Sequence, residues 1–317
     1  MGNNVLAYTA RRLIAGIPVV FVVVFLTFAL VYLTPGDAAT VIAGEDATQE
    51  QIEAVRVSLG LDQPFLVQFA AWGGRLLSGD LGHSLVLPMS VGDALLARAE
   101  PTIMLALFAQ FIAILIAIPL GVIAGRFSGR FFDRAVNMFA VAGIAVPTFV
   151  IGIGLIMLFS ITLAIAPTGG YATLSEGLPA TLGSLLLPAI ALGVAQAAFM
   201  VRITRTSMHA VFRSDFVRAA TMRGFSQQRL VFRHVIRPGL GPTISAIGIS
   251  FATLISGSIV VEIVFNLPGL GRLLITAVQN RDIPVLQGLL LVITLCYVLI
   301  NIITDVIQAI VNPRIAL

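Results

Sequence analysis

The sequence predicts an all-α integral membrane protein with six transmembrane helices and both termini in the cytoplasm. Hydrophobic residues make up 58% of the 317 residues and charged residues only 11%, and the mean hydropathy is +1.02. A typical soluble domain has about 25% charged residues, and a disordered chain is poor in apolar residues. The apolar residues also form long runs, with arginines gathered between alternate runs. A soluble or disordered protein is therefore excluded.

Six runs approach the length of about 20 mostly apolar residues that a helix needs to cross a bilayer. They lie at about residues 13–33, 102–125, 135–165, 185–201, 243–264 and 285–311. Pro147 predicts a kink in the third run. The first run exceeds the roughly 7–15 apolar residues of a signal-peptide core, so we expect a span there rather than a cleaved leader. Gly125 and Gly129 lie where the second run ends, so we expect no helix-packing motif from that pair.

The arginines set the expected orientation. Arg11 and Arg12 precede the first run, and residues 202–237 hold eight arginines against one acid, whereas residues 34–101 carry nine acids and three arginines. The positive-inside rule places the termini and residues 207–240 in the cytoplasm and residues 34–101 outside. Nucleic-acid binding is the alternative for an arginine-rich segment. Because the bias alternates with the spans, we favour topology and expect no nucleic-acid partner.

Several enzyme chemistries lack their residues in this chain. It has no lysine, so it has neither a Walker A loop of its own nor a Schiff-base lysine. Cys296 is the one cysteine, and the three histidines are far apart without an H-E-x-x-H motif. We therefore expect no catalytic residue, no metal site and no cofactor in this chain.

Each of the two longer polar segments contains a helix signal. Thr48 to Gln51 form a capping-box pattern, followed by apolar residues at helical spacing, which predicts a short amphipathic helix outside. In residues 207–240, Ser214 can cap a helix and Gly224 can end it in a left-handed conformation. A second helix must end near Pro238. The result is a helix–Gly–helix knob in the cytoplasm.

The first helix of this knob would present a partly apolar surface. The residues in question are Phe216, Val217, Ala219 and Ala220. A cytoplasmic loop does not need such a surface for solubility, so the pattern favours docking of a soluble partner. The alternative is an amphipathic helix that lies on lipid headgroups.

The knob resembles the EAA loop of importer-type ABC transporter permeases. That loop has an E-A-A-like triplet followed, after three residues, by Gly, and here Arg218–Ala220 precede Gly224. Arg218 departs from the acidic residue of the general pattern. Residues 215–224 instead match the D-[YF]-V-R-x-A-x-x-x-G form of the peptide-transport subfamily, whereas Pro238 replaces a frequent Asn.

Further blocks, in the same order, resemble DppB/OppB-like permease subunits of dipeptide and oligopeptide ABC importers. They lie at residues 11–13, 35–37, 59–64, 79–84, 101–102, 262–272, 281–288 and 312–314. Ala38 replaces a usual Pro. The resemblance covers nearly the whole chain.

This resemblance implies a type I ABC importer permease fold in the bacterial cytoplasmic (inner) membrane. It implies transport of di- or oligopeptides by alternating access, or, in the same architecture, of a nickel chelate, glutathione or another small solute. The implied partners are a paralogous second permease, two cytoplasmic ATPases that bind ATP and Mg²⁺, an extracytoplasmic solute-binding protein and membrane lipid. The residues implied in coupling to an ATPase are Asp215, Phe216, Val217, Arg218, Ala219, Ala220 and Gly224.

Candidates for gating and for the pathway lie late in the chain. Glu262, near the outer end of the fifth span, is either a partner of Arg272 or Arg281 or a gate residue. Residues expected near the translocation mouth are Pro268, Gly269, Gly271, Arg272, Arg281 and Asp282. Pathway candidates are Ser250, Thr253, Ser256 and Ser258, although hydroxyl groups in membrane helices also serve packing. Asp305, near the inner end of the sixth span, is expected in an ion pair.

Two competing functions lack support in the sequence. A stand-alone secondary transporter needs carboxylates for its coupling ion at mid-membrane, and no Asp or Glu lies central in any predicted span. An intramembrane protease of the Ser–His type needs a histidine within a span. We therefore favour the importer permease.

Overall fold

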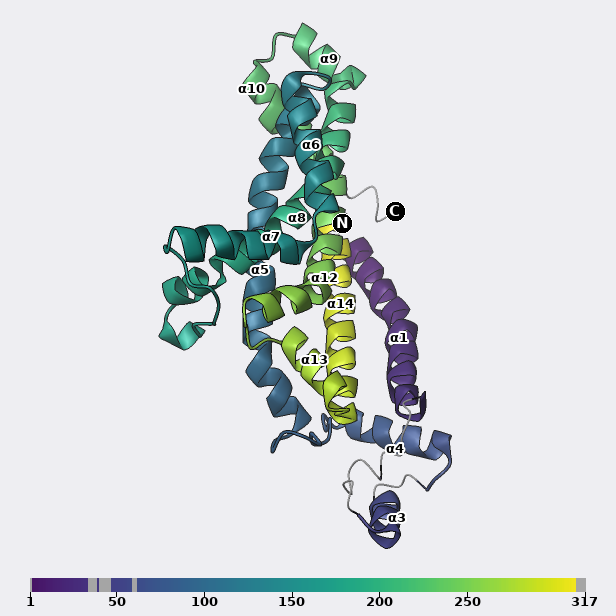
Figure 1. Ribbon diagram of the computed structural model, residues 1–317. Coiled ribbons are helices and arrows are strands. Elements are labelled where there is room, and N and C mark those ends of the chain that lie inside the picture. Colours follow the sequence, from purple (N-terminus) through teal and green to yellow (C-terminus); the bar gives the residue numbers. More distant parts are fainter. Residues whose placement is uncertain (1, 34–38, 40–46, 59–61, 312–317) are drawn as a thin grey trace. The chain divides into compact units, whose positions relative to one another are not determined.

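The computed structural model describes residues 2–33, 39, 47–58 and 62–311 (Figure 1). The sequence blocks at 35–37, 59–61 and 312–314 lie outside these residues. Within the described ranges the chain is mainly helical, and its β structure is limited to one isolated bridge between His83 and Ser90.

Five of the described helices are long and apolar enough to cross a membrane. They are α1 (Gly2–Leu33), α5 (Val91–Arg126), α8 (Leu178–Phe212), α12 (Gly241–Val264) and α14 (Ile283–Val311). A sixth span results if the bent pair of α6 (Phe131–Ala145) with α7 (Thr148–Leu155) and η1 (Ile156–Thr162) is counted as one. The chain forms two compact units, Met1–Ile14 with Ala99–Arg272 and Cys296–Leu317, and Ala15–Arg98 with Leu273–Leu295.

The third apolar run is broken rather than kinked. α6 and the α7–η1 segment are bent by 99° at Val146 and Pro147. A residue before proline is pushed out of the helical region, and Val146 is extended, with φ −86° and ψ 122°. Pro147 also has no N–H to continue the hydrogen bonds of α6. The predicted bend is therefore confirmed, and it is sharper than a kink.

The helices α1, α5 and α8 extend well beyond the predicted apolar runs, and the ends of α5 and α8 bear on the site. α5 begins at Val91, because the Ser90 hydroxyl accepts the N–H of Asp93 at 3.1 Å and donates to its carboxylate at 2.7 Å. α8 continues to Phe212, so Arg205 lies on a helix rather than in a loop. Local capping and helix continuity, rather than the apolar run, set these ends.

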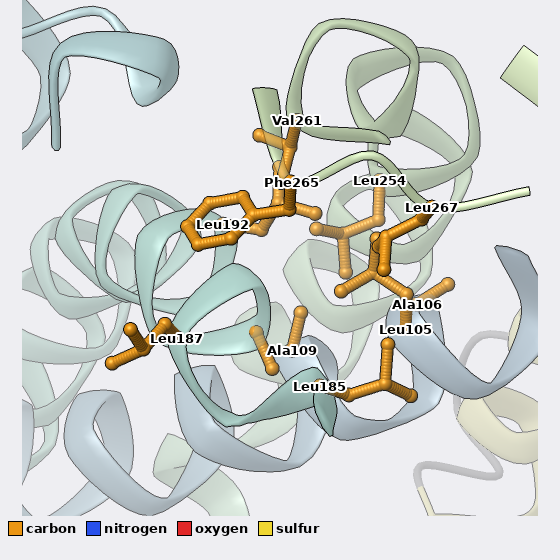
Figure 2. Close-up of a cluster of buried hydrophobic side chains, with 11 residues drawn as sticks. Leu105, Ala106, Ala109, Leu185, Leu187, Leu192, Leu254, Val261, Phe265 and Leu267 are labelled. Carbon is orange, nitrogen blue, oxygen red and sulfur yellow. The ribbon is translucent and has the colours of Figure 1, made fainter. Parts of the chain in front are cut away.

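In the first unit, α8 packs against α6, α7 and α12. A buried cluster joins α5, α8, α12 and the turn after α12 (Figure 2). Its members include Leu105, Ala106, Ala109, Leu185, Leu187, Leu192, Leu254, Val261, Phe265 and Leu267. Gly193 lets α8 approach α5 closely, since a Cβ there would lie 2.8 Å from the Ala109 carbonyl oxygen. Elsewhere in this unit, Arg12 Nε lies 3.2 Å from the Asp305 carboxylate, which confirms the predicted ion pair.

In the second unit, the described residues that follow α1 include two short helices. α3 (Gln49–Ser58) starts with the predicted capping box, because the N–H of Thr48 donates to Gln51 Oε1 at 2.9 Å and the N–H of Gln51 donates to Thr48 Oγ1 at 3.3 Å. α4 (Phe65–Leu77) was not predicted. It packs on α1 through aromatic rings, with Phe28 5.3 Å from Phe65 and 5.4 Å from Trp72 between centroids.

Candidate functional site

The predicted cytoplasmic knob follows directly from α8. It comprises α9 (Asp215–Met222), α10 (Gln227–Leu230), the π-helical segment η3 (Val231–Val235) and α11 (Ile236–Gly239). The second helix of the knob is thus three short segments that end one residue after Pro238. α9 and α10 are in contact beyond the end of α8 (Figure 1).

The two ends of α9 form in different ways. Gly224 has φ +79°, a left-handed conformation, and its N–H donates to the Thr221 carbonyl at 3.0 Å, so the predicted helix stop is confirmed. The predicted side-chain cap is wrong. Ser214 stands before the first residue of α9, but its hydroxyl donates to the Val211 carbonyl at 2.7 Å and therefore serves the end of α8.

The coupling candidates on α9 divide into exposed and buried residues. Asp215 and Arg218 are exposed, with 3.8 Å between their charged groups, and an ion pair so solvated contributes little stability. Phe216 is 47% exposed. Val217 instead is 5% exposed, so the prediction that it forms part of the outer surface is wrong. A partner that docks on α9 would contact Phe216 and not Val217.

Val217 faces inward because it anchors α9. It belongs to a buried cluster with Met208 of α8, Leu230 of α10 and Val235 of η3. Ala220 is half-buried and packs against the same cluster. The knob is therefore a packed element fixed to the end of α8.

The end of α8 is fixed in turn to α5 through two glycines. A Cβ on Gly121 would lie 2.5 Å from Thr204 Cβ, and a Cβ on Gly125 would lie 2.7 Å from Met208 Cβ. Small residues four apart let membrane helices approach closely. The prediction that Gly125 and Gly129 form no packing pair is confirmed, since a Cβ on Gly129 would meet no atom within 4 Å, and Gly125 packs on α8 together with Gly121 instead.

A buried ion pair connects α8 to the start of α6. Arg205 donates to the Asp133 carboxylate from Nε and from Nη2, the latter at 2.8 Å, and the side chain of Asp133 is only 4% exposed. Gly129 N–H also donates to this carboxylate, at 2.8 Å. Sequence reasoning missed this pair. The available signal was a single acid among the arginines just before the third apolar run.

The region after α12 contains a turn and a further helix. The turn leads into α13 (Leu270–Gln279), a helix that was not predicted. Glu262 is fully buried and contacts the hydroxyl groups of Thr102 and Ser258. Arg272 donates its backbone N–H to Glu262 and its guanidinium to Asn266. The predicted pairing of Glu262 with Arg272 is therefore a backbone contact and not an ion pair.

The remaining mouth candidates differ in exposure. Arg272 and Arg281 are exposed, Pro268 is half-buried, and Gly269, Gly271 and Asp282 are buried. Asp282 accepts hydrogen bonds from the Ser84 hydroxyl and, at 3.2 Å, from the Leu85 N–H. Among these candidates, a docking protein could therefore reach the two arginines most readily.

The four pathway candidates lie on two faces of α12. Ser250 and Ser258 are fully buried, and they donate to Gln110 Oε1 at 3.0 Å and to Glu262 at 3.1 Å. Thr253 and Ser256 are exposed. Only the exposed pair remains available to a solute, because the buried hydroxyl groups serve packing within the chain. In the described part of the chain, no three His, Cys, Asp or Glu side chains are grouped as a metal site requires.

Comparisons with known proteins give a consistent assignment. Residues 117–317 match the family described as binding-protein-dependent transport system inner membrane component, and residues 5–86 match the N-terminal part of such components. The chain is 40% identical over 308 residues to a probable peptide ABC transporter permease protein of Sinorhizobium fredii, with 97% of this chain and 98% of the relative covered. It is also 40% identical over 310 residues to a glutathione transport system permease protein of Escherichia coli, with 98% and 99% covered.

Among solved structures, the chain resembles an inward-facing MetNI methionine ABC transporter. The TM-score is 0.56 at 17% identity, over 69% of this chain and 96% of the transporter chain. At this identity the resemblance concerns the fold alone.

Proposed function

This chain belongs to the family of binding-protein-dependent transport system inner membrane components, and from that premise we propose that it imports di- and oligopeptides as a permease subunit of an ABC transporter. Its place is the bacterial inner membrane, which it crosses several times. The observation that carries the peptide substrate is the 40% identity, over nearly the full length, to a relative named as a peptide ABC transporter permease.

In the proposed mechanism, α9 is the coupling helix. Its exposed residues Asp215, Phe216 and Arg218 would sit in a groove of a partner ATPase, which binds ATP and Mg²⁺. Closure of the ATPase pair would move α9, and the anchor at Val217 would pass that movement to α8. The close contacts that Gly121 and Gly125 of α5 make with α8 would then move α5 together with α8 as a rigid body. The spans would thereby alternate between inward- and outward-open arrangements.

The proposed assembly has four kinds of partner. A paralogous second permease would complete the pathway, two ATPases would bind on the cytoplasmic side, and a solute-binding protein would dock outside. Lipid would surround the apolar helices. The arginine-rich knob and both termini would lie in the cytoplasm, with residues 34–101 outside. The contact between Arg12 and Asp305 supports the placement of both termini on the same side of the membrane, because it joins the first part of α1 to the last part of α14.

Glutathione is the second substrate candidate. It is itself a small peptide derivative, and a relative at 40% identity is named as a glutathione permease. The chelates and other solutes implied by the sequence resemblance have no such relative among those described above. Much of the selection would lie on the binding protein, which is a separate chain.

Two measurements test this proposal. Purification of the tagged chain from mildly solubilised membranes, followed by mass spectrometry, should recover ATPase subunits and a second multi-pass permease. Recovery of the chain alone, or with copies of itself, would contradict the importer. Uptake of labelled dipeptides, tripeptides and glutathione is then compared in cells that lack or express the chain. Expression-dependent uptake of glutathione without peptide uptake would overturn the peptide assignment.

A further inference from the structure

Glu262 is held in a network that the transport proposal does not use. The carboxylate lies at the end of α12 and is fully buried. Thr102 Oγ1 and Ser258 Oγ donate to Oε1 at 2.7 and 3.1 Å, and the N–H of Arg272 donates to Oε2 at 3.0 Å. Both oxygens are therefore engaged by groups of the same chain.

These contacts satisfy the start of α13. The first N–H groups of a helix have no partner within the helix, and they favour a negative charge nearby. Here the N–H of Leu270 donates to Thr102 Oγ1 at 2.8 Å, and the N–H of Arg272 donates to Glu262 Oε2 at 3.0 Å. Glu262 and Thr102 thus act together as the N-terminal cap of α13.

The turn closes directly over the carboxylate. A Cβ on Gly269 would collide with the carboxylate of Glu262, and a Cβ on Gly271 would lie 2.9 Å from its Oε2 and 2.6 Å from Ile259 Cα. Both positions therefore require glycine by space rather than by backbone conformation. The same closeness means that neither a solute nor a docking protein has room at this carboxylate.

Two apolar side chains hold the other end of the turn. Phe265 and Leu267 are 1% and 0% exposed, within the cluster that includes Leu105 of α5 (Figure 2). The turn is thereby fastened to α5 twice, by apolar packing and by the bond between Glu262 and Thr102. Loss of the carboxylate would release only the second fastening.

We propose that Glu262 is a positioning residue, which caps α13 and holds residues 265–271 against α5. Transport depends on it through the position of this outer turn and not through contact with the solute or the binding protein. The transport part of this inference rests on the proposed function, whereas the capping part does not.

Amide hydrogen exchange of the chain in lipid nanodiscs tests the cap without any substrate. In Glu262→Ala, peptides that cover residues 265–279 should exchange roughly tenfold faster, because the hydrogen bonds that the Glu262 side chain accepts are lost. Glu262→Gln keeps the size but has one acceptor oxygen instead of two, so its increase should be smaller. If the alanine variant does not fold, Glu262→Gln alone provides the hydrogen-exchange test.

A matched pair of threonines gives the control. Thr102→Val removes the bond to Leu270 N–H and should speed exchange over the same peptides. Thr206→Val is the same substitution on α8, where the Thr206 hydroxyl donates to the Arg202 carbonyl of its own helix. This variant should leave the exchange of residues 265–279 unchanged. Unchanged exchange at residues 265–279 in both Glu262 variants would overturn the capping assignment.

A transport measurement then separates positioning from substrate contact. A positioning role predicts that Glu262→Gln lowers the uptake of different peptides by one common factor. If Glu262→Gln instead changed the preference among peptides, the residue would contact the solute and the inference would be wrong. The exchange result stands even if the chain transports no peptide, so failure of the two proposals can be told apart.

Discussion

Replacing Arg205 alone should destabilise this protein more than replacing Arg205 and Asp133 together. Asp133 is 4% exposed in its side chain, and Arg205 binds it through two donors. Removing one partner of a buried ion pair costs about 3–5 kcal/mol, because the other charge stays buried without compensation. Arg205 is 25% exposed, and the Gly129 N–H still donates to the Asp133 carboxylate in the variant. For Arg205→Gln we therefore expect a loss at the lower end of this range, about 3 kcal/mol. The double variant with Asp133→Asn removes the stranded charge and should cost about 1 kcal/mol.

The assay is the unfolding of the purified chain in detergent, measured for both single variants and the double variant. Arg202→Gln is the matched control, because Arg202 is exposed on the same helix, and its change should stay within about 0.5 kcal/mol. The reasoning fails if Arg205→Gln is no more destabilising than Arg202→Gln. It also fails if the costs of the two single variants simply add in the double variant.

Two further predictions concern the knob. Gly224→Val should lower the free energy of unfolding by about 1–2 kcal/mol, because the residue has φ +79°, and it should lower transport while membrane insertion persists. Gly224→Asn should have a smaller effect, because Asn tolerates this conformation. Equal transport by both variants would contradict the role of the backbone. Phe216→Ala should reduce the co-purification of an ATPase with little loss of stability, because Phe216 is exposed. Val217→Ala should lower the free energy of unfolding by about 2 kcal/mol, because Val217 is buried. Reversed effects at the two positions would exclude the docking face described for α9.

Local sequence signals predicted some elements correctly. The capping box at Thr48, the left-handed stop at Gly224 and the break at Pro147 each depend on a few neighbouring residues, and each is present. The sequence analysis predicts neither α4 nor α13, because both are short helices outside the six long apolar runs. Ser214 shows the limit of such signals, because its hydroxyl bonds to the preceding helix and not to the one it precedes.

The faces of the helices could not be predicted in the same way. Ser250 and Thr253 are both hydroxyl residues in one apolar helix with little amphipathic character, yet one is buried against Gln110 and the other is exposed. In a membrane helix the lipid-facing and packed faces are both apolar, so periodicity gives little information about orientation. The prediction that Val217 lies on the outer surface was wrong for a related reason. The sequence places it among four apolar residues of α9, and nothing in the local pattern indicates which of the four faces inward.

The sequence by itself determined the membrane class, the apolar runs, the charge bias that predicts their orientation and the resemblance to peptide importers, because composition and local pattern carry that information. The tertiary structure decided what the buried charges do. Glu262 meets Thr102 across 160 residues of chain, and Arg205 meets Asp133 across 72. No local pattern encodes such pairs. A buried carboxylate is tolerated only where distant segments bring donors to it, so its purpose becomes visible only once those segments are packed.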